Sequence, residues 1–333
     1  MHSKALLLVL LLTSGGCTGS TPGEDDTGTA PVLAGPYLGQ TPPGTEPELF
    51  APGIVSTGMH TRDLAMSPEG DEIYFSIQAG PLVAILGSRL VDGAWTEPEV
   101  APFSRDPSMV YYEPHVAPDG ERFFFVAQKA CQEGNDIWVM DRVDNGWGMP
   151  RRLGAPINSP RSETYPSVTR DGTLYFSRAD EASDAEHIYR SRLVNGQYRE
   201  PERLPAQVNC GKSQFNAFVA PDESYVIVPV WGRSDSIGSV DYSVVYRSAG
   251  DRWSEPVNLG PNINTPGGRE YTPYVSPDGR YFFFMSTRAA AEAPPGGFSR
   301  QDLLRAHALP ENGNSDIYWV DAAFIHALRP GSP

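Results

Sequence analysis

Two glutamates occupy equivalent places in two similar stretches of the chain, and each stretch also carries an arginine. Glu163 shares its stretch with Arg178, and Glu270 shares its stretch with Arg288. Glycoside hydrolases use two carboxyl groups roughly 5 to 10 Å apart, so the two glutamates could form a catalytic pair, or bind a sugar or a small anion. Alternatively, each glutamate pairs with its own arginine. Because both residue types occur together in the same two stretches, the sequence favours the structural ion pairs.

Trp231 is a further candidate for ligand binding, because it ends a predicted strand in a third such stretch. Its ring could stack on a sugar, although packing within the sheet is the simpler use. Other chemistry has no counterpart in the sequence. There is no G-x-S-x-G elbow, P-loop, G-x-G-x-x-G, H-E-x-x-H or C-x-x-C motif, and the six histidines are scattered. We therefore predict no cofactor and no metal site.

The charge of the chain argues against a nucleic-acid partner. The formal net charge is −15, and the acidic residues are spread along the sequence rather than gathered in a tail. An acidic surface repels phosphate backbones, and no stripe of lysine and arginine is present to offset it. We predict that the protein does not bind nucleic acid.

The N-terminus has the features of an export signal. Lys4 precedes an apolar stretch at 5–12, which is far shorter than the roughly twenty apolar residues of a transmembrane helix. Small residues then lead to Cys17, a pattern that resembles a bacterial lipoprotein processing site, although Ser14 stands where such sites usually carry leucine. The sequence favours lipidation of Cys17 over an ordinary secretory signal. We expect an outer-membrane lipoprotein of the cell envelope, with a secreted or soluble periplasmic protein as the alternative.

Residues 17–44 are mostly Thr, Gly, Ser, Pro and Asp. Such a segment buries too little apolar surface to offset the entropy lost on ordering. We therefore predict a signal peptide over 1–16, a flexible tether over 17–44 and a folded domain over 45–333. Cys131 and Cys210 are the cysteines that remain in this domain. Export makes a disulfide between them possible, and two free thiols are the alternative.

Five copies of one turn, about fifty residues apart, define a repeat. They lie at 66–70, 116–120, 168–172, 219–223 and 275–279. Proline presets φ for a type I turn, Asp bonds nearby backbone, and the final glycine adopts a left-handed conformation. An aromatic run follows each turn, so each copy is predicted to be an antiparallel hairpin. Glu223 replaces the glycine in the fourth copy, which predicts local strain or a different turn.

A third strand and a fourth strand complete each repeat. The fourth carries an aromatic residue three positions before a proline, and proline is confined to edge strands. Four short antiparallel strands per repeat predict the blade of a β-propeller. The fifth repeat lacks its fourth strand, and residues 45–57 match the missing piece. We therefore predict an all-β, five-bladed ring closed by an N-terminal outer strand; the alternative is six blades.

The repeat motifs resemble the WD40-like PD40 repeats of TolB-type propellers over residues 45–328. The shared elements are the aromatic-x-x-Pro strand, Leu-Gly-x-x-Ile-Asn-Thr-Pro, Pro-x-Val-Ser-Pro-Asp-Gly and Asp-Ile-Tyr. The resemblance implies an exported scaffold and no particular reaction. We expect a non-catalytic scaffold that binds a protein or a glycan at its channel mouth and meets the membrane only through its anchor. The alternative is a carbohydrate-active hydrolase of the five-bladed type.

The two functions make different demands on the channel mouth. A hydrolase requires converging carboxyl groups that no arginine occupies. A scaffold is expected to have a flat mouth whose acidic side chains are paired.

Lipidation of Cys17 is open to a direct test. We expect intact-mass spectrometry of the mature protein to find a chain that begins at an acylated Cys17, since the apolar run, the small residues and the polar segment after them all fit this processing. A chain that begins at an unmodified Cys17, or at a later residue, contradicts the anchor.

Overall fold

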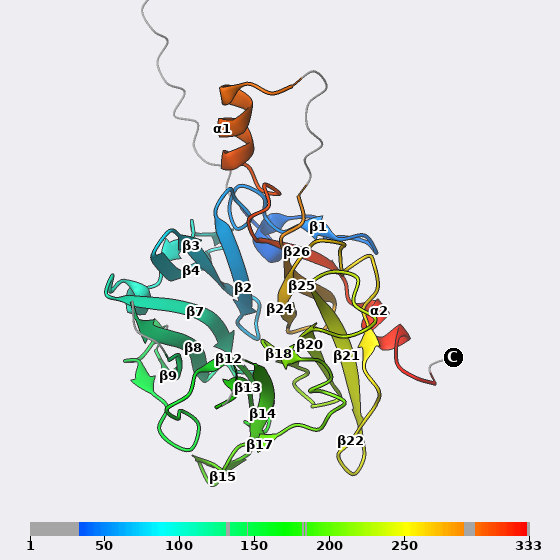
Figure 1. Cartoon of the computed structure of the whole chain (residues 1–333). Helices are drawn as coiled ribbons and strands as arrows, with labels where there is room; N and C mark the ends of the chain where they lie inside the picture. Colours follow the sequence, from blue (N-terminus) through cyan, green and yellow to red (C-terminus); the bar gives the residue numbers. More distant parts are fainter. Residues whose placement is uncertain are drawn as a thin grey trace, which may run out of the picture. The chain divides into compact units, whose positions relative to one another are not determined.

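The structure is a computed structural model that describes residues 33–130, 134–144, 146–181, 183, 185–289 and 297–331. The predicted signal peptide, Cys17 and Cys131 lie outside these residues. Within them, five antiparallel sheets are arranged around a common axis (Figure 1). This confirms the five-bladed propeller.

Each blade contains three main strands and short outer pieces. Blade 1 is β2 (His60–Met66), β3 (Glu72–Ala79), β4 (Leu82–Val91), β5 (Ala94–Trp95) and β6 (Glu99–Val100). Blade 2 is β7 (Met109–Val116), β8 (Arg122–Lys129), β9 (Asp136–Val143), β10 (Gly146–Trp147) and β11 (Arg151–Arg152). Blade 3 is β12 (Glu163–Val168), β13 (Leu174–Ala179), β14 (Glu186–Ser191) and β17 (Glu202–Arg203), with the hairpin β15 (Leu193–Val194) and β16 (Gln197–Tyr198).

The inner strand of blade 4 is interrupted. This blade consists of β18 (Ser213–Gln214), β19 (Phe218–Val219), β20 (Tyr225–Trp231), β21 (Val240–Ser248), β22 (Arg252–Trp253) and β23 (Val257–Asn258). Blade 5 consists of β24 (Glu270–Val275), β25 (Tyr281–Ser286), β26 (Asp316–Asp321) and β1 (Glu48–Leu49). The helical elements are η1 (Tyr37–Gly39), η2 (Pro102–Ser104), α1 (Arg300–Ala308) and α2 (Ala323–Ala327). None of the helices in the described ranges is long and apolar enough to cross a bilayer.

Proline divides the outer strand into two pieces in four blades. Pro98, Pro150, Pro201 and Pro256 each lie just before the second short piece, where the first piece has already ended. Proline has no backbone N–H to donate to a ladder, so the interruption follows from its chemistry. The predicted fourth strand is therefore a pair of short edge segments.

The N-terminal strand closes the ring as predicted. β1 pairs with β26, with Glu48 opposite Trp319 and Leu49 opposite Tyr318. Phe50 follows directly, is fully buried, and its ring lies 5.0 Å from Phe283 and 5.2 Å from Trp319 between centroids. Closure thus covers the edge of blade 5 and adds an aromatic anchor to the core.

Residues 33–44 differ from the predicted tether because they pack on the ring. Leu38 is buried, and the ring of Tyr37 packs against Tyr281, 5.1 Å away between centroids. The carbonyl of Leu33 accepts a hydrogen bond from the backbone N–H of Trp95. A few apolar side chains among polar residues are thus enough to hold residues 33–44 on the ring.

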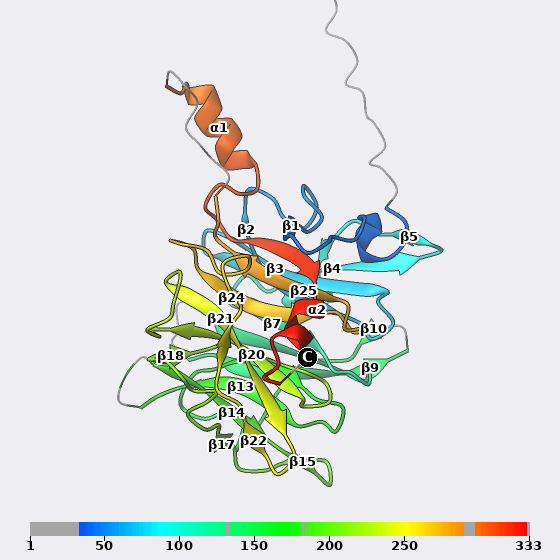
Figure 2. The same ribbon diagram turned by 90° about the vertical axis from the view of Figure 1, so that its right-hand side faces the viewer.

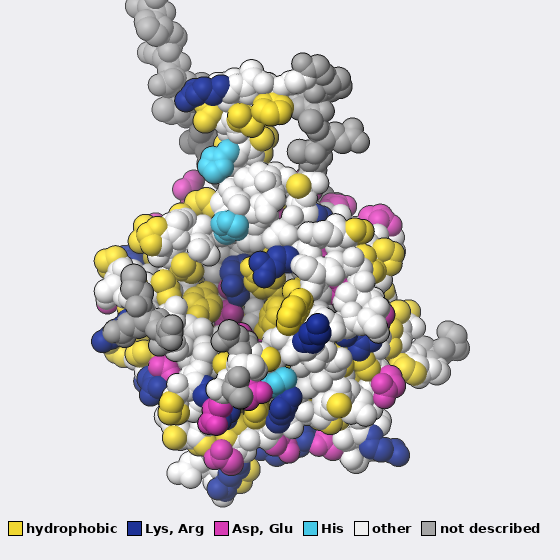
Figure 3. All heavy atoms as spheres, in the orientation of Figure 1, with side chains coloured by type: hydrophobic (Ala, Val, Ile, Leu, Met, Phe, Trp, Pro, Cys, Tyr) yellow, Lys and Arg dark blue, Asp and Glu magenta, His cyan; other side chains and the backbone are white. Residues whose placement is uncertain are grey.

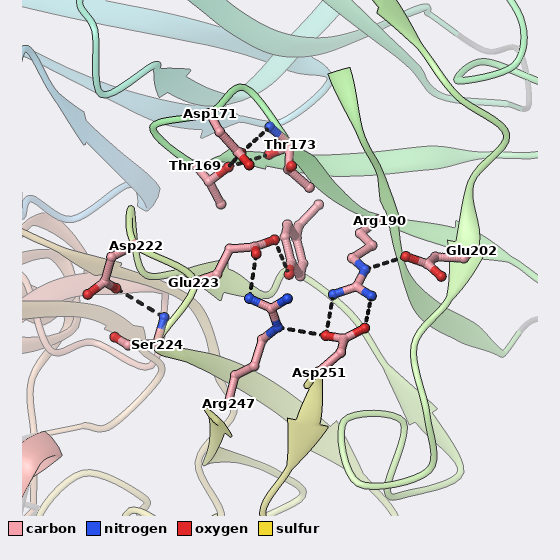
Figure 4. A network of polar contacts seen from close by, with 11 residues as sticks. Thr169, Asp171, Thr173, Arg190, Glu202, Asp222, Glu223, Ser224, Arg247 and Asp251 are labelled. Carbon is pink, nitrogen blue, oxygen red and sulfur yellow. Dashed lines mark hydrogen bonds and ion pairs between the residues drawn. The ribbon is translucent and has the colours of Figure 1, made fainter. Parts of the chain in front are cut away.

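Glu223 adopts the left-handed conformation that the other four repeats give to glycine, with φ of 57°. Its carboxylate accepts hydrogen bonds from Tyr175 Oη (2.8 Å) and Arg247 Nη1 (2.6 Å). Arg247 also binds Asp251, which in turn binds Arg190 (Figure 4). This network joins blades 3 and 4. The predicted strain is present, and the ion pairs between the blades offset it.

Replacing Glu223 by glycine should destabilise the domain despite relieving the backbone. The change removes about 1 kcal/mol of strain but leaves Tyr175 and Arg247 without their acceptor, which costs more. We expect a net loss of about 1 to 3 kcal/mol in the free energy of unfolding, measured by urea denaturation. Gly279→Glu is the matched control: it adds the strain at an equivalent turn where no side chain lies within 4 Å. A more stable Glu223→Gly variant would contradict the network's role.

Candidate functional site

One residue in each inner strand has a left-handed backbone conformation. These residues are Asp63, Glu113, Tyr165, Asn216 and Thr272, with φ between 52° and 67°. Each lies seven positions before the end of the repeated turn. In blades 1, 2, 3 and 5 the strand register shifts at this point, as in a β-bulge. We call these five the bulge residues.

Each bulge breaks the ladder, and in blades 1 to 4 the N–H of the bulge residue bonds to a side chain of the blade before it in the ring. Asp63 N–H donates to Thr272 Oγ1 (3.3 Å), and Glu113 N–H donates to Asp63 Oδ2 (3.1 Å). Tyr165 N–H donates to Glu113 Oε2 (2.6 Å). Asn216 N–H donates to Ser177 Oγ of the blade before it (2.8 Å). Side chains near the axis therefore connect the blades in sequence around the ring.

The residue before each bulge residue lines a central cavity of about 440 Å³. These five are Arg62, Tyr112, Thr164, Phe215 and Tyr271. The remaining lining residues come from neighbouring positions: Gln78, Val83, Val110, Glu113, Gln128, Asn135, Glu186, Asn216, Val240 and Arg269. Figure 3 shows the hollow at the centre of this face, with basic, acidic and hydrophobic side chains around it. All five blades contribute to this candidate site.

Arg62 holds two carboxylates at the base of the site. Its Nε lies 3.0 Å from Asp63 Oδ1, and its Nη2 lies 2.8 Å from Glu113 Oε1. The guanidinium also lies over the rings of Tyr112 and Tyr271, at 5.6 and 5.0 Å from their centroids. Burial and the nearby Asp63 raise the pKa of Glu113, while Arg62 opposes this shift. One guanidinium thus serves two buried acids.

Glu186 is a second acidic group in the cavity, contributed by β14. Its Oε2 accepts a hydrogen bond from Thr164 Oγ1 (3.2 Å). Burial raises its pKa. Glu186 forms no ion pair within the described ranges. The site therefore holds one carboxyl group that is not engaged by a cation.

Aromatic and amide groups form the rest of the wall. The rings of Phe215 and Tyr271 meet edge to face, 6.4 Å apart between centroids. Tyr112 Oη donates a hydrogen bond to Asn135 Oδ1. Tyr165 reaches from blade 3 to the carbonyl of Pro273 in blade 5 (2.8 Å), so it crosses the ring between non-adjacent blades. In the described residues, no cluster of three or more His, Cys, Asp or Glu is placed to hold a metal ion.

The two predicted glutamates lie outside this cavity. Glu163 forms the predicted ion pair with Arg178, with Oε1 2.8 Å from Nε. Ser159 donates two further hydrogen bonds to Glu163, and Arg178 donates to the carbonyls of Pro156 and Ile157. Both side chains are buried and occupied. This pair is structural.

The second predicted ion pair is wrong, because a serine separates its members. Ser286 Oγ donates to Glu270 Oε1 (2.8 Å), and Arg288 Nε donates to the same Ser286 Oγ (3.1 Å). Arg288 Nη2 instead binds the carbonyl of Ile263. Glu270 is completely buried, its Oε2 has no partner in the described residues, and burial raises its pKa.

The glutamates predicted from the sequence lie one position away from the cavity-facing residue of their strand. Glu163 and Glu270 lie two residues before a bulge residue, whereas the cavity-facing side chains lie one residue before it. Successive side chains of a strand point to opposite faces, so this offset sends the glutamates into the sheet. The repeat spacing could have identified Arg62 and Glu113, but only if it were known which residues of the inner strand face the cavity.

Trp231 and Cys210 also lie outside the lining of the cavity. Trp231 ends β20 with 49% of its surface exposed, and Lys212 Nζ lies 5.4 Å from its ring centroid. Its exposure agrees with neither full packing in the sheet nor a place in the central site. Cys210 is partly buried, which raises its pKa. Because Cys131 lies outside the described residues, the disulfide stays a prediction.

No family model and no curated protein matches the chain, so membership of the PD40 repeat family also stays a prediction. Among solved structures, the chain is similar to TolB from Acinetobacter baumannii at 14% identity and a TM-score of 0.45, covering 79% of this chain and 57% of that one. It is also similar to a putative TolB from Agrobacterium tumefaciens, at 16% identity and a TM-score of 0.46, covering 78% of this chain and 90% of that one. A GH43 endo-arabinanase from Bacillus licheniformis is similar at 12% identity and a TM-score of 0.46, covering 79% of this chain and 93% of that one.

The raised pKa of Glu113 predicts a pH dependence of stability. The pKa of Glu113 is about 8 in the folded protein and about 4.5 in the unfolded chain. The proton that Glu113 holds in the folded state therefore adds to the free energy of unfolding. This addition is complete below about pH 4.5 and is lost as the pH rises through 8. Relative to Glu113→Gln, the wild type should lose unfolding free energy between pH 5 and 8 in urea titrations. A constant difference between wild type and Glu113→Gln would contradict the shift.

Proposed function

We propose that the protein is an exported, lipid-anchored, non-catalytic binding protein that holds a saccharide in its central cavity. The observation that carries this proposal is that the carboxyl oxygens of Asp63 and Glu113 are already bound by other groups of the protein. Both carboxylates are bound by Arg62, and each also accepts a backbone N–H from the next blade. A nucleophile or general base needs a free oxygen directed at its substrate, whereas these oxygens already have partners.

The lining supports a saccharide as the ligand. Sugars present hydroxyl groups that donate and accept hydrogen bonds, and apolar C–H faces that pack on aromatic rings. The cavity offers amides from Gln78, Gln128 and Asn216 and rings from Phe215 and Tyr271. Sites of this kind combine apolar walls with a few placed polar groups. The hollow differs from the expected flat mouth and gives the scaffold a concave site for a glycan rather than for a protein surface.

A carbohydrate-active hydrolase is the second candidate, because two carboxyl groups with raised pKa line the same cavity. Burial raises the pKa of Glu113 and of Glu186. A general acid requires such a shift in order to hold its proton near neutral pH. On this alternative, Glu186 would be the acid, since Arg62 already occupies Glu113.

Binding and turnover by the same preparation would test both functions. The purified mature chain is applied to an oligosaccharide array, and each hit is measured by calorimetry and assayed for released reducing ends. We expect binding without release. Tyr271→Ala should weaken binding about tenfold or more, as expected for an aromatic contact at the centre of a site, while Trp231→Ala, outside the cavity, should not.

Glu186→Gln separates the two candidates further. In a binding protein, the amide keeps most of the hydrogen bonding and the affinity changes little. In a hydrolase, turnover falls by a factor of about 100 or more. Glycosidic cleavage that Glu186→Gln abolishes and Glu181→Gln preserves would refute the non-catalytic proposal.

A further inference from the structure

A short arm at residues 297–310, which includes α1, meets the described part of the ring only at its C-terminal end, where the backbone of His307 and Ala308 lies against Gly58. No residue of α1 is buried. Phe298, Leu303, Leu304 and Leu309 are 62, 55, 45 and 52% exposed. Apolar side chains concentrated in so short a stretch are costly in water, and such a patch marks a surface for interaction.

The arm has a defined local structure. Ser299 and Asp302 form a capping box at the start of α1, with Ser299 Oγ accepting from Asp302 N–H (3.3 Å). Asn312 and Asn314 anchor its base by donating to the carbonyl of Gly58, at 3.1 and 2.8 Å. An isolated helix of nine residues is only marginally stable in water. The arm is thus prepared to gain stability from a surface that covers its leucines.

The charge of the arm differs in sign from that of the whole chain. Arg300 and Arg305 outnumber Asp302 within 297–310, whereas the chain carries a net charge of −15. The single acid is already used by the helix cap and by Arg305, 3.7 Å away. Leucines flanked by arginines suit an anionic lipid surface, where apolar side chains enter the interface and basic groups meet headgroups.

The position of the arm agrees with a membrane on that side of the ring. α1 projects outward from the rim near β1 and β2 and does not cross the cavity (Figures 1 and 2). Leu33, the first described residue, accepts a hydrogen bond from the backbone N–H of Trp95 in β5. Figure 2 shows β5 at the same upper edge of the ring as α1, but on the opposite side of the view. Fifteen residues, 18–32, separate Leu33 from Cys17. At most about 3.5 Å per residue, they can reach a bilayer that the arm also contacts.

We propose that this arm docks on anionic phospholipid and acts as a second membrane contact besides the lipid anchor. The ring would then stand with its rim toward the bilayer, leaving the cavity accessible from the side. The proposal is independent of the ligand in the cavity. It also requires no lipidation, so it can be tested on a chain that has no acyl group.

The test uses the mature chain with Cys17→Ser and co-sedimentation with vesicles. Vesicles of phosphatidylethanolamine and phosphatidylglycerol at 3:1 should bind the protein more strongly than vesicles of phosphatidylcholine. Leu303→Asp with Leu304→Asp should weaken this partitioning at least about tenfold, since burial of even one leucine is worth more than a factor of ten. Leu82→Asp, at a position 59% exposed on another blade, is the matched control and should bind as the parent does.

Thermal melting and array binding confirm that the double variant remains folded and keeps its cavity intact. The proposal is overturned if the parent does not bind either vesicle, or if the double variant binds as well as the parent. It is also overturned if light scattering shows a dimer that the double variant disrupts, because the arm would then contact a second copy.

Discussion

The left-handed conformation of the five bulge residues is the constraint on which the ring and its site depend. A non-glycine residue in this region costs roughly 1 kcal/mol or more, and the N–H released by the bulge costs more if it stays unpaired. Asp63 and Glu113 solve the second problem for the blade that follows each of them. Thr272 Oγ1 and Ser177 Oγ accept the equivalent N–H groups at two other junctions. What the junction needs is therefore an oxygen acceptor, and Arg62 binds both acids that serve this purpose.

Closing the ring with the N-terminal strand leaves the aspartate on the third strand of blade 5 without a hydrogen-bond donor from the outer strand. Arg152 in blade 2 and Asn258 in blade 4 bind the aspartate that lies near them on the third strand. By register, Leu49 stands in the same place in blade 5 and offers no donor. Asp316 consequently keeps one oxygen without a partner in the described chain, and burial raises its pKa to about 6. The hydrogen bond from Glu311 N–H satisfies the other oxygen.

The sequence predicts the features that repeat and misses those that depend on side-chain direction. Turn residues, strand order and the closing strand are encoded locally, so the blades and β1 were predictable. The cavity was not, because a bulge changes which face a residue occupies and leaves no composition signal. Glu163 has the predicted partner because Arg178 stands directly opposite it in the strand register, whereas Ser286 stands opposite Glu270. The arginine of blade 5 was misassigned because Ser286 intervenes, which the spacing to Arg288 does not reveal.

The pairing of β1 with β26 also ties completion of the fold to completion of synthesis. The first strand of the domain must wait for one of the last before blade 5 has all four strands. Contacts between distant parts of a chain form slowly, because a large loop must close before they contribute stability. A chain that is still being synthesised therefore cannot complete its ring, because β26 lies near the end of the domain. Until β26 has been made, the fifth blade is incomplete and the ring keeps an open sheet edge, the kind of edge that can pair with another chain.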